Sequence, residues 1–287
     1  MKAIVCVKQV PDTSGKVAVN ENGTLDRASM ATIINPDDLN AVEAALVLKE
    51  QTGCEVDVVT MGPPPAEGML RELLARGCDK GYLISAREFG GSDTYATSQI
   101  IAAGLNKIGI EADDIVFCGR QAIDGDTAQV GPQVAEKLGL PQVTYAESVN
   151  VEDGKAIVKR RLESGVETVE CPLPLVVTVN GSADACRPRN ARLIQKYKYA
   201  VTPSEKATLA EDKLKLVEAR DFLNLKEWGA AEINADLEQC GLAGSPTKVK
   251  NVVNVVFVAK ESKVIEGNDE EGLECLIKDL IAEHTIG

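Results

Sequence analysis

The sequence is poor in histidine, on which many hydrolytic enzymes depend. Its 287 residues include a single histidine, His284, which is the fourth residue from the end. A Ser-His-Asp or Cys-His catalytic group needs a histidine base held within the fold. The scarcity of histidine therefore argues against hydrolytic chemistry, and also against a metal bound by histidines.

Cysteine patterns typical of metal sites are missing as well. No two of the eight cysteines form a Cys-x-x-Cys pair, the spacing that zinc and iron–sulfur sites commonly use. Most of them stand in apolar runs, so we expect small core residues and no bound metal. The eight are Cys6, Cys54, Cys78, Cys118, Cys171, Cys186, Cys240 and Cys275.

Basic residues are too few for a general nucleic-acid surface. Lys and Arg number 31 against 44 Asp and Glu, which leaves a formal net charge of −13 and argues against nucleic acid or an anionic membrane as partner. No apolar run approaches the roughly 20 residues of a membrane span, and the first residues read as a strand rather than a signal peptide. We therefore expect a cytoplasmic protein.

The two common nucleotide fingerprints, Gly-x-x-x-x-Gly-Lys-Ser/Thr and Gly-x-Gly-x-x-Gly after a strand, are absent. The chain has instead IVFCGRQAIDGDTAQVG at residues 115–131. Residues 115–118 predict a buried parallel strand, an Asp-Gly-Asp turn follows, and Thr127 suits the N-cap of a helix that runs to Leu138. This order of strand, glycine-containing loop and helix start predicts a phosphate-binding loop at the carboxyl edge of a parallel sheet.

A purely structural loop accounts for this local pattern equally well, because every α/β protein has several strand-loop-helix units and Asp-Gly turns are common. Asp124 and Asp126 would repel a bare phosphate. We therefore expect these two side chains to hold the turn, to cap the helix or to bond a ribose hydroxyl.

Two further segments are expected at the same sheet edge. Asn35 precedes Pro36 at a helix start, where the local pattern favours capping by its side chain over ligand contact. Residues 90–94 open a helix predicted over residues 95–107, with Thr94 and Thr97 on one face. This helix start adds a second anion-accepting group to the edge, although a capped surface helix explains the residues without a ligand.

The strand pattern predicts an α/β fold with a parallel sheet, an antiparallel edge meander and a C-terminal arm. Residues 1–180 are expected to form the nucleotide-binding domain. Residues 181–287, which lack a repeated unit, are expected to form an arm that wraps a partner. The supporting segments are buried strands at 3–7, 55–60, 81–85, 115–118 and 174–179, a hairpin at 17–25, the meander at 143–171, an apolar run at 252–259 and an amphipathic helix near 269–283.

Four segments resemble the β subunit of electron-transfer flavoproteins. They are VCVKQVPD at residues 5–12, INPD at residues 34–37, GRQAIDGD at residues 119–126 with Gln129 and Gly131, and the meander signature at residues 158–178. Ser164 departs mildly from the glycine or aspartate usual in that family. The resemblance implies a three-layer α/β domain of the adenine-nucleotide-binding type, in complex with an α subunit that carries an electron-transferring FAD.

Residues 91–97, GSDTYAT, are similar to a stretch of the electron-bifurcating members of that family, in which a second FAD replaces the AMP of conventional β subunits. The resemblance implies that NADH reduces this FAD. One electron then passes to a low-potential ferredoxin or flavodoxin, and the other passes through the α-subunit FAD to an acyl-CoA dehydrogenase. The alternatives are a conventional β subunit with structural AMP and, from another class, a non-redox adenine-nucleotide-binding protein. The C-terminal arm and the meander count against the non-redox protein, because neither is needed to hold a nucleotide.

The resemblance also assigns site residues. Near the adenine and ribose it implies Cys6, Val7, Asn35, Asp38 and Met61. Around the ribose and phosphates it implies Gly119, Gln121, Gly125, Asp126, Thr127, Gln129, Val130 and Gly131. Thr94 and Thr97 would serve the second flavin or NADH, and Leu193, within PRNARLI at residues 188–194, would anchor the dehydrogenase.

Overall fold

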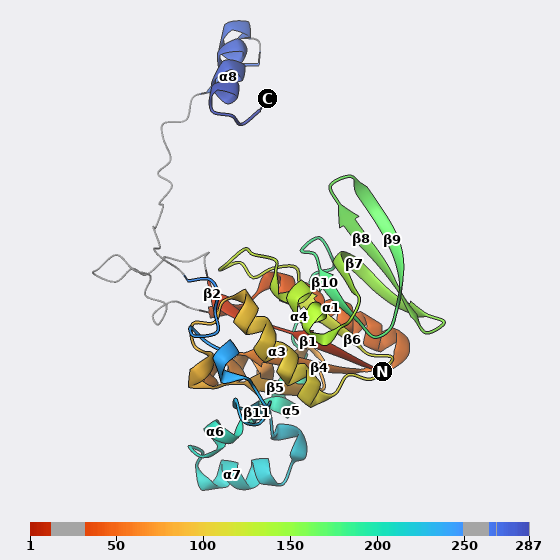
Figure 1. The fold of residues 1–287 in the computed structure, drawn as a ribbon, viewed down its shortest axis with the longest axis vertical. Helices are drawn as coiled ribbons and strands as arrows, with labels where there is room; N and C mark the ends of the chain where they lie inside the picture. Colours follow the sequence, from red (N-terminus) through yellow and green to blue (C-terminus); the bar gives the residue numbers. More distant parts are fainter. Residues whose placement is uncertain (13–31, 249–263, 268, 287) are drawn as a thin grey trace, which may run out of the picture.

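The computed structural model describes residues 1–12, 32–248, 264–267 and 269–286 (Figure 1). The hairpin expected at residues 17–25 and the apolar run at 252–259 lie outside these ranges. In the described parts of the chain, no helix combines the length and the apolar character needed to cross a bilayer.

A nine-stranded sheet forms the centre of the fold. Its strand order is β11-β5-β4-β1-β6-β10-β7-β8-β9. Neighbours from β11 to β7 run parallel, and β7, β8 and β9 pair antiparallel. The strands are β1 (Lys2–Cys6), β4 (Glu55–Met61), β5 (Lys80–Ile84), β6 (Ile115–Gly119), β7 (Gln142–Glu152), β8 (Lys155–Leu162), β9 (Gly165–Pro172), β10 (Leu175–Val179) and β11 (Lys226–Trp228). The predicted α/β fold and edge meander are confirmed.

Helices cover both faces of the parallel strands and make three layers. One core holds Val5 and Phe117 with residues of α1 (Pro36–Thr52) and α2 (Glu67–Arg76). The other core holds Ile4 and Val116 with residues of α3 (Thr94–Ile108) and α4 (Val130–Leu138). Successive residues of one strand thus pack in opposite cores, which is why the central strands read as continuous apolar runs.

The meander follows the turns that the sequence indicates. Asp153 and Gly154 take φ of 49° and 74° between β7 and β8, and Gly165 takes φ of 145° as β9 begins. Left-handed backbone of this kind suits glycine and aspartate, so these residues fix where each strand reverses. A separate two-stranded sheet pairs β2 (Gln9–Pro11) with β3 (Thr32–Ile34) beside the end of β1.

Much of the segment expected as a C-terminal arm packs against the sheet and the helices of residues 1–180. This differs from an arm that starts at residue 181. β11 extends the sheet beside β5, and Val201 and Leu225 are buried in the core shared with α1 and α2. Arg187 pairs with Glu43 of α1 over 2.8 Å. The short elements of this region are α5 (Ala191–Tyr197), α6 (Pro203–Lys206) and α7 (Glu211–Glu218).

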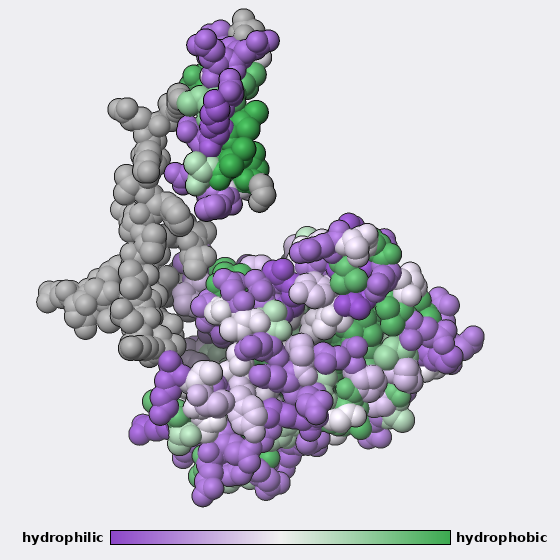
Figure 2. All heavy atoms as spheres, turned by 45° about the horizontal axis from the view of Figure 1, so that its top comes forward, coloured by the Kyte–Doolittle hydropathy of each residue, from purple (hydrophilic) through white to green (hydrophobic). Residues whose placement is uncertain are grey.

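The amphipathic helix expected near residues 269–283 is confirmed as α8 (Glu270–Ala282), with Asp269 as its N-cap. Its apolar side chains face outward: Ile277 and Ile281 are each 51% exposed, and Figure 2 shows apolar side chains gathered along one side of the helix. Whether residues 181–287 wrap a partner stays a prediction.

Candidate functional site

The loop between β6 and α4 leaves the sheet at the carboxyl ends of the parallel strands, as expected. The prediction that Thr127 caps the helix is wrong, because α4 begins at Val130 and Gln129 holds the N-cap position without a side-chain bond. Asp126 and Ala128 take φ of 49° and 51°, and these left-handed residues carry the loop past Thr127 before the helix starts.

Asn35 organises this loop from outside it. Its Nδ2 donates to the carbonyl of Gln121 over 2.8 Å, and the backbone N–H of Ile123 donates to its Oδ1 over 3.1 Å. The side chain makes no capping bond to α1 and is fully buried, so the expectation that Asn35 caps the helix with its amide is wrong. The amide instead supplies both partners that one stretch of loop backbone needs.

Asp38 joins three elements beneath the loop. Its Oδ2 accepts the backbone N–H of Lys8 over 2.7 Å, and its Oδ1 accepts that of Gly119 over 3.2 Å. Burial raises the pKa of this carboxyl to about 7 against the hydrogen bonds that favour its charged form. A Cβ on Gly119 would lie 2.3 Å from Asp38 Oδ1, so glycine permits this close approach of β6 to α1.

Both aspartates of the loop have partners. Asp124 accepts from Lys8 Nζ over 2.7 and 2.8 Å, and Asp126 accepts from Gln121 Nε2 over 2.9 Å. Their expected role in holding the turn is consistent with these contacts. Gly125 between them faces open space, since a Cβ there would meet no atom within 4 Å.

The last residues of the loop offer backbone hydrogen-bond donors. Within the described part of the chain, the backbone N–H groups of Thr127, Ala128 and Gln129 find no protein acceptor, and the positive end of α4 follows. Such an arrangement suits an anion. Gly131 matters for packing. A Cβ there would lie 2.6 Å from Thr178 Cγ2, so glycine allows α4 to approach β10 closely.

The start of α3 lies against the same loop. Asp93 caps the helix by accepting from the N–H of Ala96 over 3.0 Å, and Thr94 Oγ1 donates to Gln129 Oε1 over 2.9 Å. The helix begins at Thr94 rather than at Tyr95, with Thr97 half-buried one turn on. The structure thus brings together the two helix starts that the sequence indicated.

The remaining assigned residues lie at or directly after the ends of β1 and β4. Cys6 pairs in register with Cys118, both thiols are buried, and the Cys118 thiol together with burial raises the pKa of Cys6 well above its usual range. Val7 is buried, and Met61 packs half-buried against the same core as Cys6. Among the residues described, no cluster of three or more His, Cys, Asp or Glu side chains could hold a metal.

Leu193, the expected anchor for a dehydrogenase, lies in α5 and packs half-buried against the core, while its neighbour Ile194 is 39% exposed. Sequence reasoning missed Lys8 and Arg120, of which the second pairs with Asp37 over 3.2 Å. Both stand inside the quoted family-like segments, but nothing local distinguishes them from ordinary loop cations.

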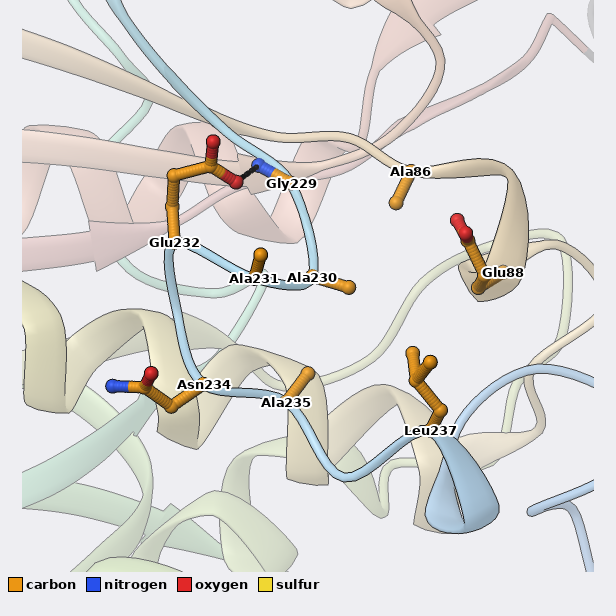
Figure 3. Close-up of a pocket in the computed structure, with 9 residues that line it drawn as sticks. All are labelled: Ala86, Glu88, Gly229, Ala230, Ala231, Glu232, Asn234, Ala235 and Leu237. Atoms are coloured by element: carbon orange, nitrogen blue, oxygen red, sulfur yellow. Dashed lines mark hydrogen bonds between the residues drawn. The ribbon is translucent and has the colours of Figure 1, made fainter.

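A separate cavity of about 510 Å³ opens beside the end of β5 (Figure 3). Its lining consists of Ala86, Glu88, residues 229–232, Asn234, Ala235 and Leu237, and Glu232 accepts the backbone N–H of Gly229 over 2.9 Å. None of the residues assigned from the sequence contributes to its lining, so this cavity is distinct from the loop site.

Comparison with known proteins identifies the family. Residues 22–209 match the electron transfer flavoprotein domain. The chain is 49% identical to the acryloyl-CoA reductase electron transfer subunit gamma of Anaerotignum propionicum and 43% identical to the electron transfer flavoprotein subunit beta of Clostridium acetobutylicum, over the full length of each chain. It is 44% identical to a caffeyl-CoA reductase-Etf complex subunit of Acetobacterium woodii, over 87% of this chain and 86% of the relative. The chain therefore belongs to the electron transfer flavoprotein family, as a member of its β-subunit branch.

Proposed function

We propose that this β subunit binds a second FAD, which accepts electrons from NADH and passes them along two routes. One electron goes to a low-potential ferredoxin or flavodoxin, and the other goes through the FAD of an α subunit to an acyl-CoA dehydrogenase. The names of two relatives, an acryloyl-CoA reductase subunit and a caffeyl-CoA reductase complex subunit, support an acyl-CoA partner. We place this activity in the cytoplasm.

The contact between Thr94 and Gln129 is the observation that carries the proposal. It joins the start of α3, which Asp93 caps, to the donor-rich end of the loop, so the two helix starts lie side by side. FAD has a pyrophosphate and AMP has one phosphate, and a dinucleotide makes fuller use of two such ends. FAD, when bound, supplies the electron chemistry, and the chain supplies binding and orientation.

The residues of the loop fit that group. The N–H groups of Thr127, Ala128 and Gln129 would hold phosphate oxygens, and the open space at Gly125 would let a ligand approach the backbone. Asn35 and Asp38 would act by positioning, because their polar atoms already bind the loop and the strand ends.

The alternative is a conventional β subunit that holds structural AMP. That reading needs only the loop and leaves the contact at Thr94 without a role in binding. Cofactor analysis of the chain purified with its α subunit tests the two. We expect two FAD per heterodimer, whereas one FAD and one AMP would establish the conventional alternative.

Two surfaces are proposed for partners. The exposed apolar side of α8, with Leu276, Ile277 and Ile281, would contact the α subunit. The segment of α5 with Leu193 and the more exposed Ile194 would contact the dehydrogenase. The apolar character of both surfaces supports these assignments, and each is tested by substitution of its exposed residues.

A further inference from the structure

The charge balance of the nucleotide loop poses a problem for phosphate binding. Residues 120–131 contain two aspartates, Asp124 and Asp126, and one basic residue, Arg120. Arg120 is paired with Asp37 of α1 over 3.2 Å. A phosphate at the free N–H groups of this loop would meet like charge and no free cation from the loop itself, so its positive partner has to come from another element.

Lys8, which follows β1, is placed to be that partner. Its backbone N–H is fixed by the buried carboxylate of Asp38 over 2.7 Å. Its side chain reaches across to the loop, is 49% exposed, and holds both carboxylate oxygens of Asp124 at 2.7 and 2.8 Å. The backbone at Lys8 is therefore anchored, while the charged end of its side chain lies at the surface, paired with Asp124.

Asp124 is held in place from its other side. The neighbouring Ile123 donates its backbone N–H to the buried Asn35, so the turn that carries Asp124 is tied to the start of α1. Asp124 lies three residues before Thr127, the first residue of the loop with a free N–H group. Its carboxylate already binds the ammonium group of Lys8, which a phosphate would need.

We propose that Lys8 is a phosphate ligand and that Asp124 is its internal competitor, so that Lys8 exchanges the carboxylate for phosphate when a nucleotide binds. This inference rests on the proposed function of the loop. A nucleotide phosphate carries more negative charge than one carboxylate and offers more acceptor oxygens. The exchange keeps Lys8 paired throughout and releases Asp124 to water. Until a phosphate binds, the carboxylate of Asp124 occupies the ammonium group of Lys8.

Calorimetric titration of the full-length chain, freed of bound nucleotide, with AMP and with adenosine tests the exchange. Lys8→Met should weaken AMP binding on the order of tenfold and leave adenosine binding unchanged, because adenosine lacks the phosphate. Asp124→Asn should tighten AMP binding by about three- to tenfold, because it removes both the competitor and a like charge. In the Lys8→Met background, the gain from Asp124→Asn should shrink markedly.

Lys80→Met is the matched control, because Lys80 is 52% exposed and pairs with Glu55 over 2.6 Å on β4 and β5, away from the loop. It should leave AMP binding unchanged, and Lys8→Arg should retain most of it. Weaker AMP binding in Asp124→Asn, or equal losses of AMP and adenosine in Lys8→Met, would overturn the exchange and leave the pair a structural contact. A wild-type chain that binds neither AMP nor FAD would instead remove the proposed function, and this inference with it.

Discussion

Thr94 Oγ1 donates a hydrogen bond to Gln129 Oε1 over 2.9 Å and joins the first residue of α3 to the residue before α4. The two residues lie 35 positions apart in the sequence. The bond therefore fixes the spacing of two helix starts at the carboxyl edge of the sheet: the start of α3, which Asp93 caps, and the start of α4, which follows the free N–H groups of the loop. We propose that a ligand with two adjacent phosphates engages both.

Replacement of Thr94 and Thr97 by valine tests this arrangement. The change keeps the volume and removes two hydroxyls, each hydrogen bond being worth on the order of 1 kcal/mol and more if it meets a charged phosphate. We expect slower reduction of the flavin by NADH in stopped-flow absorbance, while transfer through the α-subunit flavin from another donor persists. Thr52→Val, whose hydroxyl bonds Leu48 within α1, is the control. Unchanged NADH kinetics in the double variant would contradict the role.

Asn35→Ala should loosen the loop. The change leaves the carbonyl of Gln121 and the N–H of Ile123 without their buried partner, which costs about 1–3 kcal/mol where water cannot replace it. We expect a lower free energy of unfolding in urea together with lower nucleotide content. Asn40→Ala in α1, the helix that follows Asn35, removes an amide that binds the carbonyls of Ala183 and Asp184, away from the loop. Nucleotide content should fall only in the first variant.

Gly119, which ends β6, and Gly125 of the loop should respond in different ways. Gly119→Ala places a Cβ 2.3 Å from Asp38 Oδ1 and 2.6 Å from the backbone of residues 37 and 38, so we expect a loss of about 3 kcal/mol or more, or failure to fold. Gly125→Val meets open space, so stability should stay within about 0.5 kcal/mol of wild type. The valine should nevertheless lower FAD or AMP content by crowding the approach of phosphate. Thermal unfolding and cofactor analysis measure the two effects, and full nucleotide occupancy in Gly125→Val would show that the ligand does not approach there.

The sequence predicts the fold well where the pattern of apolar residues within one segment is enough to identify a strand or a helix. Strands such as β6 and β10 are buried on both faces, and this alone makes them continuous apolar runs. β11, with the sequence Lys-Glu-Trp, carries no such signal and exists only because it pairs beside β5. The same holds for Val201 and Leu225, whose burial depends on irregular segments that fold back over the body.

The candidate site is predicted in position but not in detail. Asn35 reads locally as a cap, yet its partners lie 86 and 88 residues away in the loop. Thr127 reads as a cap because the sequence does not reveal the left-handed backbone at Asp126 and Ala128 that delays the helix. The pairing of Lys8 with Asp124 spans 116 residues and has no local signature at all.

The pH dependence of stability should report the buried carboxyl of Asp38. Burial raises its pKa in the folded chain to about 7 from an ordinary value of 3.8. Between about pH 4 and 7 the folded state therefore holds a proton that the unfolded state has released, so this group lowers stability as the pH rises and adds no further change above pH 7. The slope for one group is at most about 1.4 kcal/mol per pH unit.

Comparison with Asp38→Asn isolates this contribution. Asp57, whose pKa burial raises to about 6, acts in part of the same window in both proteins and cancels in the difference. The stability of wild type relative to the variant, from urea unfolding at several pH values, should fall from pH 4 to pH 7 and then level off. A difference that does not vary with pH would show that the carboxyl titrates normally.

The last prediction concerns α8. Truncation after Asn180 would remove β11 and the buried Val201 and Leu225, so loss of α-subunit binding in that form would not separate an interface from unfolding. Substitution of the exposed Ile277 and Ile281 by aspartate avoids this, because both side chains are 51% exposed and their replacement should change stability little. We expect the full-length double variant to keep its thermal midpoint and to lose α-subunit binding in a pull-down. Glu274 and Lys278 pair over 2.7 Å on the same helix, and their replacement by glutamine is the control that should bind normally. Normal binding by the double aspartate variant would show that the apolar side of α8 does not contact the α subunit, and would direct attention to the surfaces of the body instead.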